Sequence, residues 1–115
     1  MKNKVIVVPR DKFTEHELNY NQAQKEQLIE LYLSDNEFDL LYKKKFFELI
    51  NQIAETNIDD YEDDSISGKE KIGNVLTRLN LEDHSIDDEY NKLIKKMITL
   101  FEEAFNRDTG IYFHF

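Results

Sequence analysis

Apolar and polar positions alternate with a helical period over much of the second half of the chain. The clearest stripe covers residues 86–105, and a shorter one covers residues 72–79. Spacing of three and four positions places these apolar side chains on one face of a helix. Ser85 stands where an N-cap of the longer helix would stand, and Gly110 is the expected stop signal after it. The pattern therefore predicts two amphipathic helices here.

The first half of the chain predicts two more helices. An apolar stripe over residues 28–32 predicts a helix that begins near Asn21, because the turns before it are polar despite a capping-box pattern at residues 14–17. A second capping-box pattern at residues 34–37 predicts a tight corner. The next helix then extends from that corner to Ala54.

The predicted helix over residues 35–54 is apolar on two sides. Phe38, Phe46 and Ile53 follow its main stripe, whereas Leu40 and Phe47 project from the opposite side. One interpretation places the helix at the centre of the bundle, covered on both sides. In the other interpretation, the second face is a docking surface for a partner.

The two ends of the chain are rich in strand-forming residues. Residues 4–8 (KVIVV) are β-branched and precede Pro9, and residues 111–115 (IYFHF) are mostly aromatic. These terminal segments could pair as a two-stranded ribbon, or the last one could add to a partner's sheet. The pattern as a whole predicts a mainly α fold, a bundle of about four helices with this terminal ribbon, in a single domain over residues 1–115.

Composition and charge narrow the class of protein. The chain has no Cys, which excludes disulfides, thiolate metal sites and a cysteine nucleophile. The apolar run at residues 5–8 is too short for a signal peptide or a membrane span, so we expect a cytoplasmic protein. The formal charge of −9 disfavours direct binding to nucleic acid or to anionic membranes. A basic protein is the partner that this charge favours.

Carboxylates gather in the segment between the second and third predicted helices. Residues 55–68 contain six carboxylates and no Lys or Arg, and such a run either is a solvated loop or binds something positive. Tyr61 stands at its centre, and tyrosine is enriched at binding hot spots. A second acidic group precedes the last helix. The candidate partner-binding residues are Asp59, Asp60, Tyr61, Glu62, Asp63 and Asp64, together with Asp87, Asp88 and Glu89.

Motifs for catalysis or for a bound cofactor do not occur in the sequence. The acidic segment matches the start of a calcium-binding EF-hand loop from Asp63 to Gly68, but Asn74 stands where the loop needs a bidentate Glu. His16, His84 and His114 are scattered along the chain, and no phosphate-binding loop or nucleophile elbow is present. We therefore predict a protein that is not an enzyme and that holds no metal or cofactor.

Residues 59–64 (DDYEDD), with the size, helicity and charge of the chain, resemble the immunity proteins of bacterial nuclease toxins. Colicin-type and contact-dependent inhibition systems contain such proteins. The resemblance implies a stoichiometric inhibitor that neutralises a cognate basic toxin domain, a nuclease. Tyr61 would be the anchor, and the flanking carboxylates would steer association.

An alternative function has the same electrostatic basis. A phage or another mobile element could encode the chain as a nucleic-acid mimic or adaptor that binds a DNA-binding host protein. Both interpretations predict an acidic contact surface on this chain, and they differ in the identity of the partner.

Overall fold

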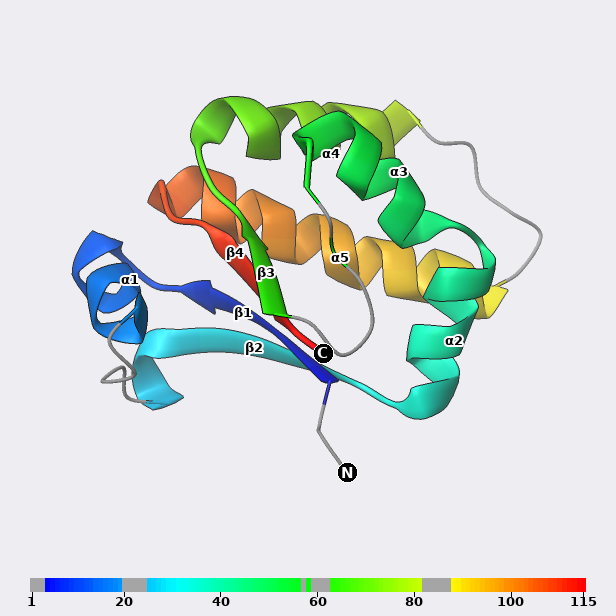
Figure 1. Ribbon diagram of the computed structural model, residues 1–115, viewed down its shortest axis with the longest axis horizontal. Helices are drawn as coiled ribbons and strands as arrows, with labels where there is room; N and C mark the ends of the chain where they lie inside the picture. The colour runs from blue at the N-terminus through cyan, green and yellow to red at the C-terminus, as the bar shows by residue number, and fades with distance from the viewer. Residues whose placement is uncertain (1–3, 20–24, 57, 59–62, 82–87) are drawn as a thin grey trace.

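A four-stranded antiparallel sheet organises the protein in the computed structural model, which describes residues 4–19, 25–56, 58, 63–81 and 88–115 (Figure 1). The sheet has the order β2-β1-β4-β3, so the first and last strands are central. The elements are β1 (Lys4–Pro9), α1 (Lys12–Asn19), the short 3₁₀ helix η1 (Lys25–Gln27), β2 (Leu28–Leu33), α2 (Asp35–Lys43), α3 (Phe46–Ala54), β3 (Asp63–Ile66), α4 (Lys69–Leu81), α5 (Asp88–Arg107) and β4 (Ile111–His114).

The prediction of a mainly α four-helix bundle is wrong, because this architecture is α+β. The terminal segments do pair, with Val5 opposite His114 and Val7 opposite Tyr112. They form the centre of a larger sheet rather than a separate ribbon, because β2 joins β1 and β3 joins β4. No helix within the described ranges has the length and apolar character needed to cross a membrane.

Residues 28–33 form strand β2 and not the predicted helix. Their pattern also fits a period of two, in which Ile29, Leu31 and Leu33 share one face while Glu30 and Tyr32 share the other. The neighbouring strand β1 offers a complete antiparallel partner from Lys4 to Pro9. Pairing with β1 therefore outweighs a weak local helical preference.

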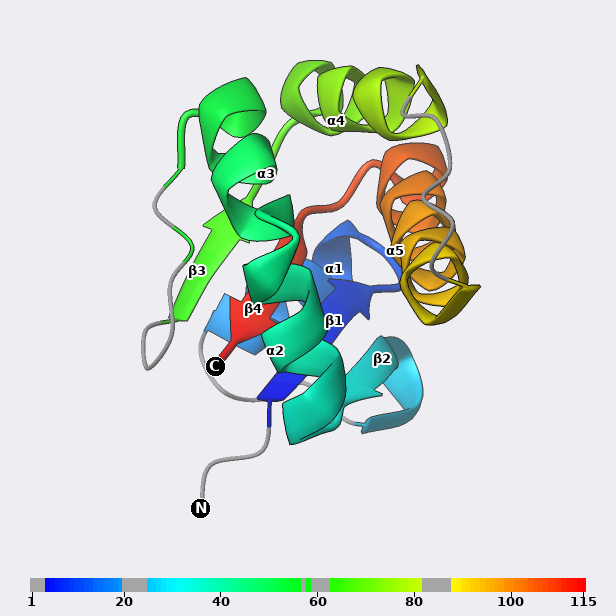
Figure 2. The same ribbon diagram turned by 90° about the vertical axis from the view of Figure 1, so that its right-hand side faces the viewer.

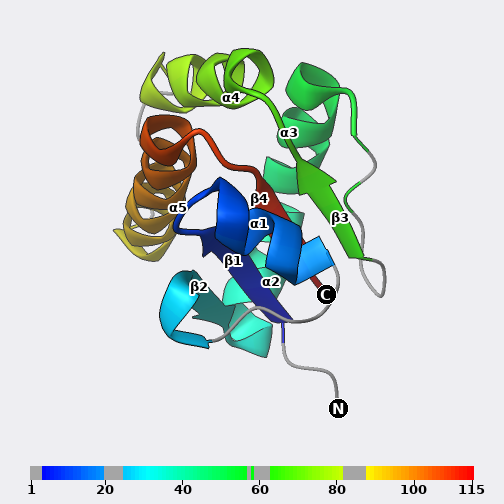
Figure 3. The same cartoon turned by 90° about the vertical axis from the view of Figure 1, so that its left-hand side faces the viewer.

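Helix α1 lies earlier in the chain than predicted. Asp11 caps it, since the Asp11 Oδ1 accepts a hydrogen bond of 2.7 Å from the Thr14 backbone N–H, and this bond lowers the pKa of the Asp11 carboxyl. The helix covers the face of the sheet that carries Tyr112, where Glu15 Oε2 accepts bonds from the Tyr112 hydroxyl at 2.9 Å and from the Gly110 N–H at 2.6 Å. Figure 3 shows α1 in front of the sheet and α2 behind it.

The predicted long helix over residues 35–54 is broken into α2 and α3. Lys45 adopts a left-handed conformation with φ 63°, which redirects the chain between them. The predicted capping box at the start of α2 is confirmed by the reciprocal Ser34–Glu37 bonds of 3.1 and 2.9 Å. Phe47 is 4% exposed and packs in the core, and Leu40 is partly buried against the same core, so both residues of the predicted second face pack inward.

Helices α4 and α5 correspond to the last two predicted helices and pack against each other on the face of the sheet opposite α1 (Figure 2). Helix α5 is not ended by Gly110, in contrast to what the sequence predicted. Asp108, with φ 56°, is the left-handed residue after the helix, and the Thr109 N–H bonds to the Ala104 carbonyl as in a Schellman motif. Gly110 is needed for space instead, since a Cβ there would lie 2.8 Å from Glu15 Oε2.

Phenylalanine rings fill the core between the sheet and the helices. Phe115 is 1% exposed, and its ring centroid lies 5.0 Å from that of Phe38, 5.3 Å from that of Phe47 and 5.8 Å from that of Phe113. These edge-on contacts are the favoured geometry for aromatic pairs. The aromatic C-terminal segment is therefore tucked into the core.

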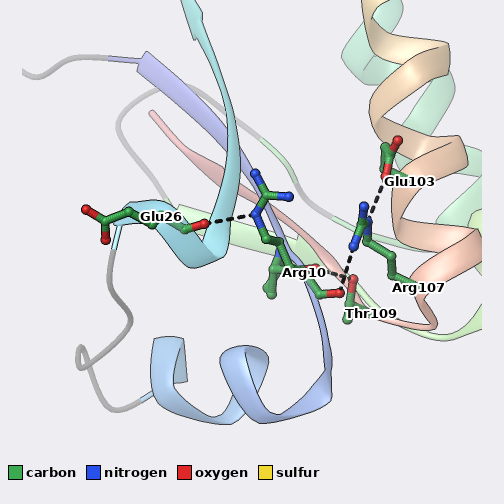
Figure 4. A network of polar contacts seen from close by, with 6 residues as sticks. Arg10, Glu26, Glu103, Arg107 and Thr109 are labelled. Carbon is green, nitrogen blue, oxygen red and sulfur yellow. Dashed lines mark hydrogen bonds and ion pairs between the residues drawn. The ribbon is translucent and has the colours of Figure 1, made fainter.

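Polar contacts hold one end of the sheet to the end of α5 (Figure 4). Arg107 forms an ion pair of 2.7 Å with Glu103 and donates to the Arg10 carbonyl at 3.2 Å. The Arg10 guanidinium in turn donates to the Glu26 carbonyl at 2.9 Å, and the Thr109 hydroxyl donates to the Pro9 carbonyl at 2.9 Å. Segments almost a hundred residues apart in sequence are joined here.

We predict that Phe115→Ala lowers the free energy of unfolding by about 3–5 kcal/mol, because it removes a buried ring and leaves a cavity. Phe13→Ala is the matched control, since Phe13 is 65% exposed, and its effect should stay within about 0.5 kcal/mol. Urea denaturation followed by circular dichroism measures both. Equal effects of the two substitutions would contradict the packing of Phe115.

Burial, and then the hydrogen bond to Glu15, raise the pKa of the Tyr112 hydroxyl well above its ordinary value. The neutral phenol is thus favoured in the folded state, and its contribution to stability is present below about pH 10 and declines as the pH rises further. We predict that Tyr112→Phe costs about 1 kcal/mol at neutral pH. The variant should also lose less stability than the wild type above pH 10, as thermal melts across pH would measure. A parallel decline in both proteins would contradict this assignment.

Candidate acidic contact site

The negative charge of the protein is concentrated in two short segments on either side of α4. Residues 55–64, the first acidic segment, contain six carboxylates, and residues 82–89, the second acidic segment, contain five. Neither contains Lys or Arg. The other 13 of the 24 carboxylates are outnumbered by the 15 Lys and Arg residues of the chain. The remainder of the protein is therefore close to neutral, and the formal charge of −9 comes from these two segments.

The first acidic segment connects the end of α3 to strand β3. Glu55 closes α3 in a left-handed conformation with φ 57°, and the Thr56 N–H bonds to the Asn51 carbonyl at 3.1 Å. The Asn51 side chain then accepts from the Ile58 N–H at 2.8 Å and donates to the Ile58 carbonyl at 3.0 Å. Ile58 itself is 3% exposed. One end of the acidic segment is thus attached firmly to α3.

The other end of the first segment is part of the sheet and not of a loop. Asp63 and Asp64 begin the edge strand β3, opposite His114 and Phe113 of β4. The Asp64 Oδ1 accepts a bond of 2.7 Å from the Ser65 N–H. Asp63 and Ser65, which matched the first two ligand positions of an EF-hand loop, are therefore extended in a strand. Asp59, Asp60, Tyr61 and Glu62 lie outside the described residues.

The second acidic segment leads into α5. Asp88 is the first residue of that helix. Glu89 lines a hollow of about 320 Å³ between α2 and α5, with Glu37, Lys92 and Lys96. Lys96 lies 4.0 Å from Glu37. Glu89 is thus surrounded by mixed charge, and Asp87 lies outside the described residues.

The structure does not bring the described ends of the two segments together. Figure 2 shows β3 on one side of the molecule and α5 on the other, with α2 and α3 between them. The described ends of the two segments are therefore apart, and the candidate residues Asp59, Asp60, Tyr61, Glu62 and Asp87 lie outside the described residues. This separation follows from the fold, because β3 lies at a sheet edge and α5 crosses the opposite side of the helical layer.

Asp63 and Asp64 also have a simple structural role. Charged residues on an edge strand discourage pairing with a strand of another molecule. Sequence reasoning placed these residues in a loop and so missed this role. It also missed Glu30 and Tyr32, which lie on the other edge strand, because it placed them in a helix; the alternation from Ile29 to Leu33 is the signal that could have identified them.

Metal binding finds no support in the described part of the chain. Among those residues, no group of three or more His, Asp or Glu side chains is arranged to hold an ion. His16 lies in α1 and His114 in β4, and His84 lies outside the description. The absence of enzymatic activity stays a prediction.

The fold and the charge distribution define a class, a small acidic α+β protein with two negative segments attached to a nearly neutral body. No protein-family model matches the chain, and a search of curated proteins found no match either. Among solved structures, the fold is similar to that of the Neisseria DNA mimic protein DMP12, with a TM-score of 0.68 and 23% identity. The match covers 99% of this chain and 100% of that chain. At this identity, the likeness shows a shared fold.

Repulsion within the first acidic segment predicts a stability change. Replacing Asp59, Asp60, Asp63 and Asp64 with Asn should raise the melting temperature at low salt by roughly 3 °C, and the gain should fade as salt screens the charges. The matched control replaces four exposed carboxylates elsewhere, Asp39, Glu48, Glu70 and Glu102, with their amides.

The control has the same net charge as the first variant, but its substitutions lie where charges are balanced. Its melting temperature should therefore change less, which scanning calorimetry at two salt concentrations would measure. If the control raised the melting temperature more than the first variant, the repulsion would not be concentrated in the first acidic segment.

Proposed function

We propose that this protein binds the DNA-binding surface of a basic protein and competes with DNA for it. The observation that carries the proposal is the distribution of charge, in which 11 carboxylates without a basic residue are confined to two short segments. Such regions match the Lys and Arg residues with which proteins bind phosphates. The rest of the surface is nearly neutral and adds little repulsion or attraction of its own.

The separation of the described ends of the two acidic segments supports a nucleic-acid mimic over a single-patch inhibitor. Duplex DNA presents two phosphate strands on either side of a groove, and its partners contact both. The described ends of the acidic segments likewise lie on different sides of α2 and α3 (Figure 2). The shared fold with a protein named as a DNA mimic agrees with this proposal.

Association should be fast and sensitive to salt. Opposite charges steer two proteins together and can raise the association rate constant toward about 10⁸–10⁹ M⁻¹s⁻¹ at low salt. Lys and Arg side chains that neutralise DNA phosphates release the cations condensed on the DNA, and added salt likewise screens the attraction between a basic protein surface and carboxylates. We therefore expect an affinity that falls as the salt concentration rises.

The immunity-protein interpretation differs from this proposal in its partner. It requires a toxin nuclease and inhibition of that nuclease, with Tyr61 as the anchor of the contact. Both functions use the first acidic segment, so loss of binding upon its neutralisation does not separate them. The identity of the partner does.

The test begins with basic DNA-binding proteins from the native host that are retained by the immobilised protein. For each one, fluorescence anisotropy of a labelled 20-base-pair duplex measures displacement of the DNA by this protein. We predict that the wild type releases the duplex completely. The variant with Asn at positions 59, 60, 63 and 64 should require at least about tenfold more protein, since each lost charge contact to a basic surface weakens binding.

The control with amides at positions 39, 48, 70 and 102 has the same net charge as the variant with Asn in the first acidic segment. It therefore shows whether a loss of binding is caused by the position of the charges or by the overall charge. It should displace the duplex nearly as well as the wild type. Equal loss in both variants would mean that only the overall charge matters. A ternary complex that retains the DNA would contradict the proposal, and retention of a nuclease whose activity is blocked would favour the immunity function.

A further inference from the structure

The outer edge of strand β2 is a second candidate interaction surface, distinct from the acidic segments. The strand order β2-β1-β4-β3 makes β2 and β3 the two edges of the sheet, and Figure 3 shows them on opposite sides of the molecule. Within the described ranges, no segment pairs with the outer side of β2. Its unpaired backbone groups form a template for another strand.

The register identifies which backbone groups of β2 point outward. Arg10 lies opposite Gln27, one pair beyond Pro9 and Leu28, and its N–H donates to the Gln27 carbonyl at 3.0 Å. Hydrogen-bonded pairs alternate in an antiparallel ladder. The next pair, Pro9 and Leu28, is therefore one without hydrogen bonds, which agrees with the missing N–H of Pro9. The residues whose N–H and C=O groups point away from β1 are therefore Leu28, Glu30 and Tyr32.

The two edges of the sheet differ in their protection against pairing. Strand β3 is four residues long and begins with two aspartates. Strand β2 is six residues long, with the sequence LIELYL, and contains one charge, no Lys and no Pro. Lysine, proline, short length and inward-pointing charges are the usual means by which edge strands avoid pairing. Strand β2 has none of them, so it is the edge suited to an intermolecular contact.

We propose that β2 pairs with β2 of a second copy of this chain. The two strands lie antiparallel about a twofold axis that passes beside Leu31, so the two sheets become one continuous eight-stranded sheet. In this register, Leu31 lies opposite Leu31 of the second copy, and Glu30 lies opposite Tyr32. The outward-pointing groups of Glu30 and Tyr32 then exchange backbone hydrogen bonds with their counterparts.

Side-chain chemistry favours this register over its neighbours. The Tyr32 hydroxyl already donates to the Glu30 Oε2 within one chain at 3.1 Å, and both side chains lie on the same face of the sheet. Across the axis, Tyr32 of one copy lies directly opposite Glu30 of the other. Directly opposed residues are closer than residues two positions apart on one strand, so the phenol can also reach the carboxylate of the other copy. A shift that places Glu30 opposite Glu30 would oppose like charges, which destabilises a pair of strands.

The apolar face of β2 is also continued across the axis. Ile29 and Leu31 are only half-buried and pack against the core from its margin. In the dimer, Ile29 lies beside Leu33 of the second copy, so part of this apolar area is removed from water. A contact of one strand pair is small, and we expect a weak dimer whose population depends on protein concentration.

Salt distinguishes this contact from the proposed binding of a basic partner. Each copy has a formal charge of −9, so two copies repel each other over long range. Salt screens that repulsion and should strengthen the dimer, whereas it should weaken binding to a basic protein. The inference does not depend on the proposed function, and either can fail without the other.

Sedimentation equilibrium tests the proposal with the intact chain. The wild type should approach the mass of a dimer as its concentration rises, and more readily at high salt. Tyr32→Glu should raise the dissociation constant by roughly tenfold or more, because it places a second carboxylate directly opposite Glu30 of the other copy and removes the phenol. Tyr42→Glu is the matched control with the same change in net charge, since Tyr42 is 54% exposed, Tyr32 is 52% exposed, and Tyr42 lies on α2.

A wild type that stays monomeric up to its solubility limit would overturn the proposal, as would equal effects of the two glutamate substitutions. Because the chain has no Cys, introduced cysteines report the register directly. Glu30→Cys and Tyr32→Cys should form a disulfide with each other in a mixture of the two proteins, and neither should cross-link alone. Rapid cross-linking of Glu30→Cys with itself would contradict the register.

Discussion

The antiparallel pairing of β1 with β4 is the constraint on which the rest of the structure depends. It joins the two ends of the chain at the centre of the sheet, with Val7 opposite Tyr112. This pairing places Phe113 and Phe115 under the helices and leaves β2 and β3 as the outer strands. Pairing of segments so distant in sequence carries a large entropic cost of loop closure. The sheet and the helices packed on it then position the described ends of the acidic segments at α3, β3 and α5.

A nearly neutral body with two negative segments separates stability from function. The core residues, the Phe115 ring contacts and the polar network at Arg107 hold the fold without any carboxylate of the first acidic segment. Like charges crowded in a short segment oppose folding slightly, and this cost is tolerable in a protein whose core is well packed. The proposed contact with a partner would therefore place few requirements on the core.

Local patterns in the sequence predict what short-range physics controls. The Ser34–Glu37 capping box and the stripes of α4 and α5 depend on neighbours within a few residues, and their positions are predicted well. Residues 28–33 fit both a helical and an alternating pattern, and only the distant strand β1 decides between them. The left-handed break at Lys45 has no glycine to signal it, and Gly110 was interpreted as a helix stop although Glu15 explains its small size. The acidic segments are visible in the sequence, but the separation of their described ends depends on the sheet order.

The most direct measurement is a map of backbone amide chemical shifts in the isotope-labelled protein, recorded while an unlabelled DNA-binding partner is added. The account predicts that the largest changes occur within residues 55–64 and 82–89, and that addition of duplex DNA reverses them. Changes concentrated on β2 or in the hollow between α2 and α5, with both acidic segments unaffected, would contradict it.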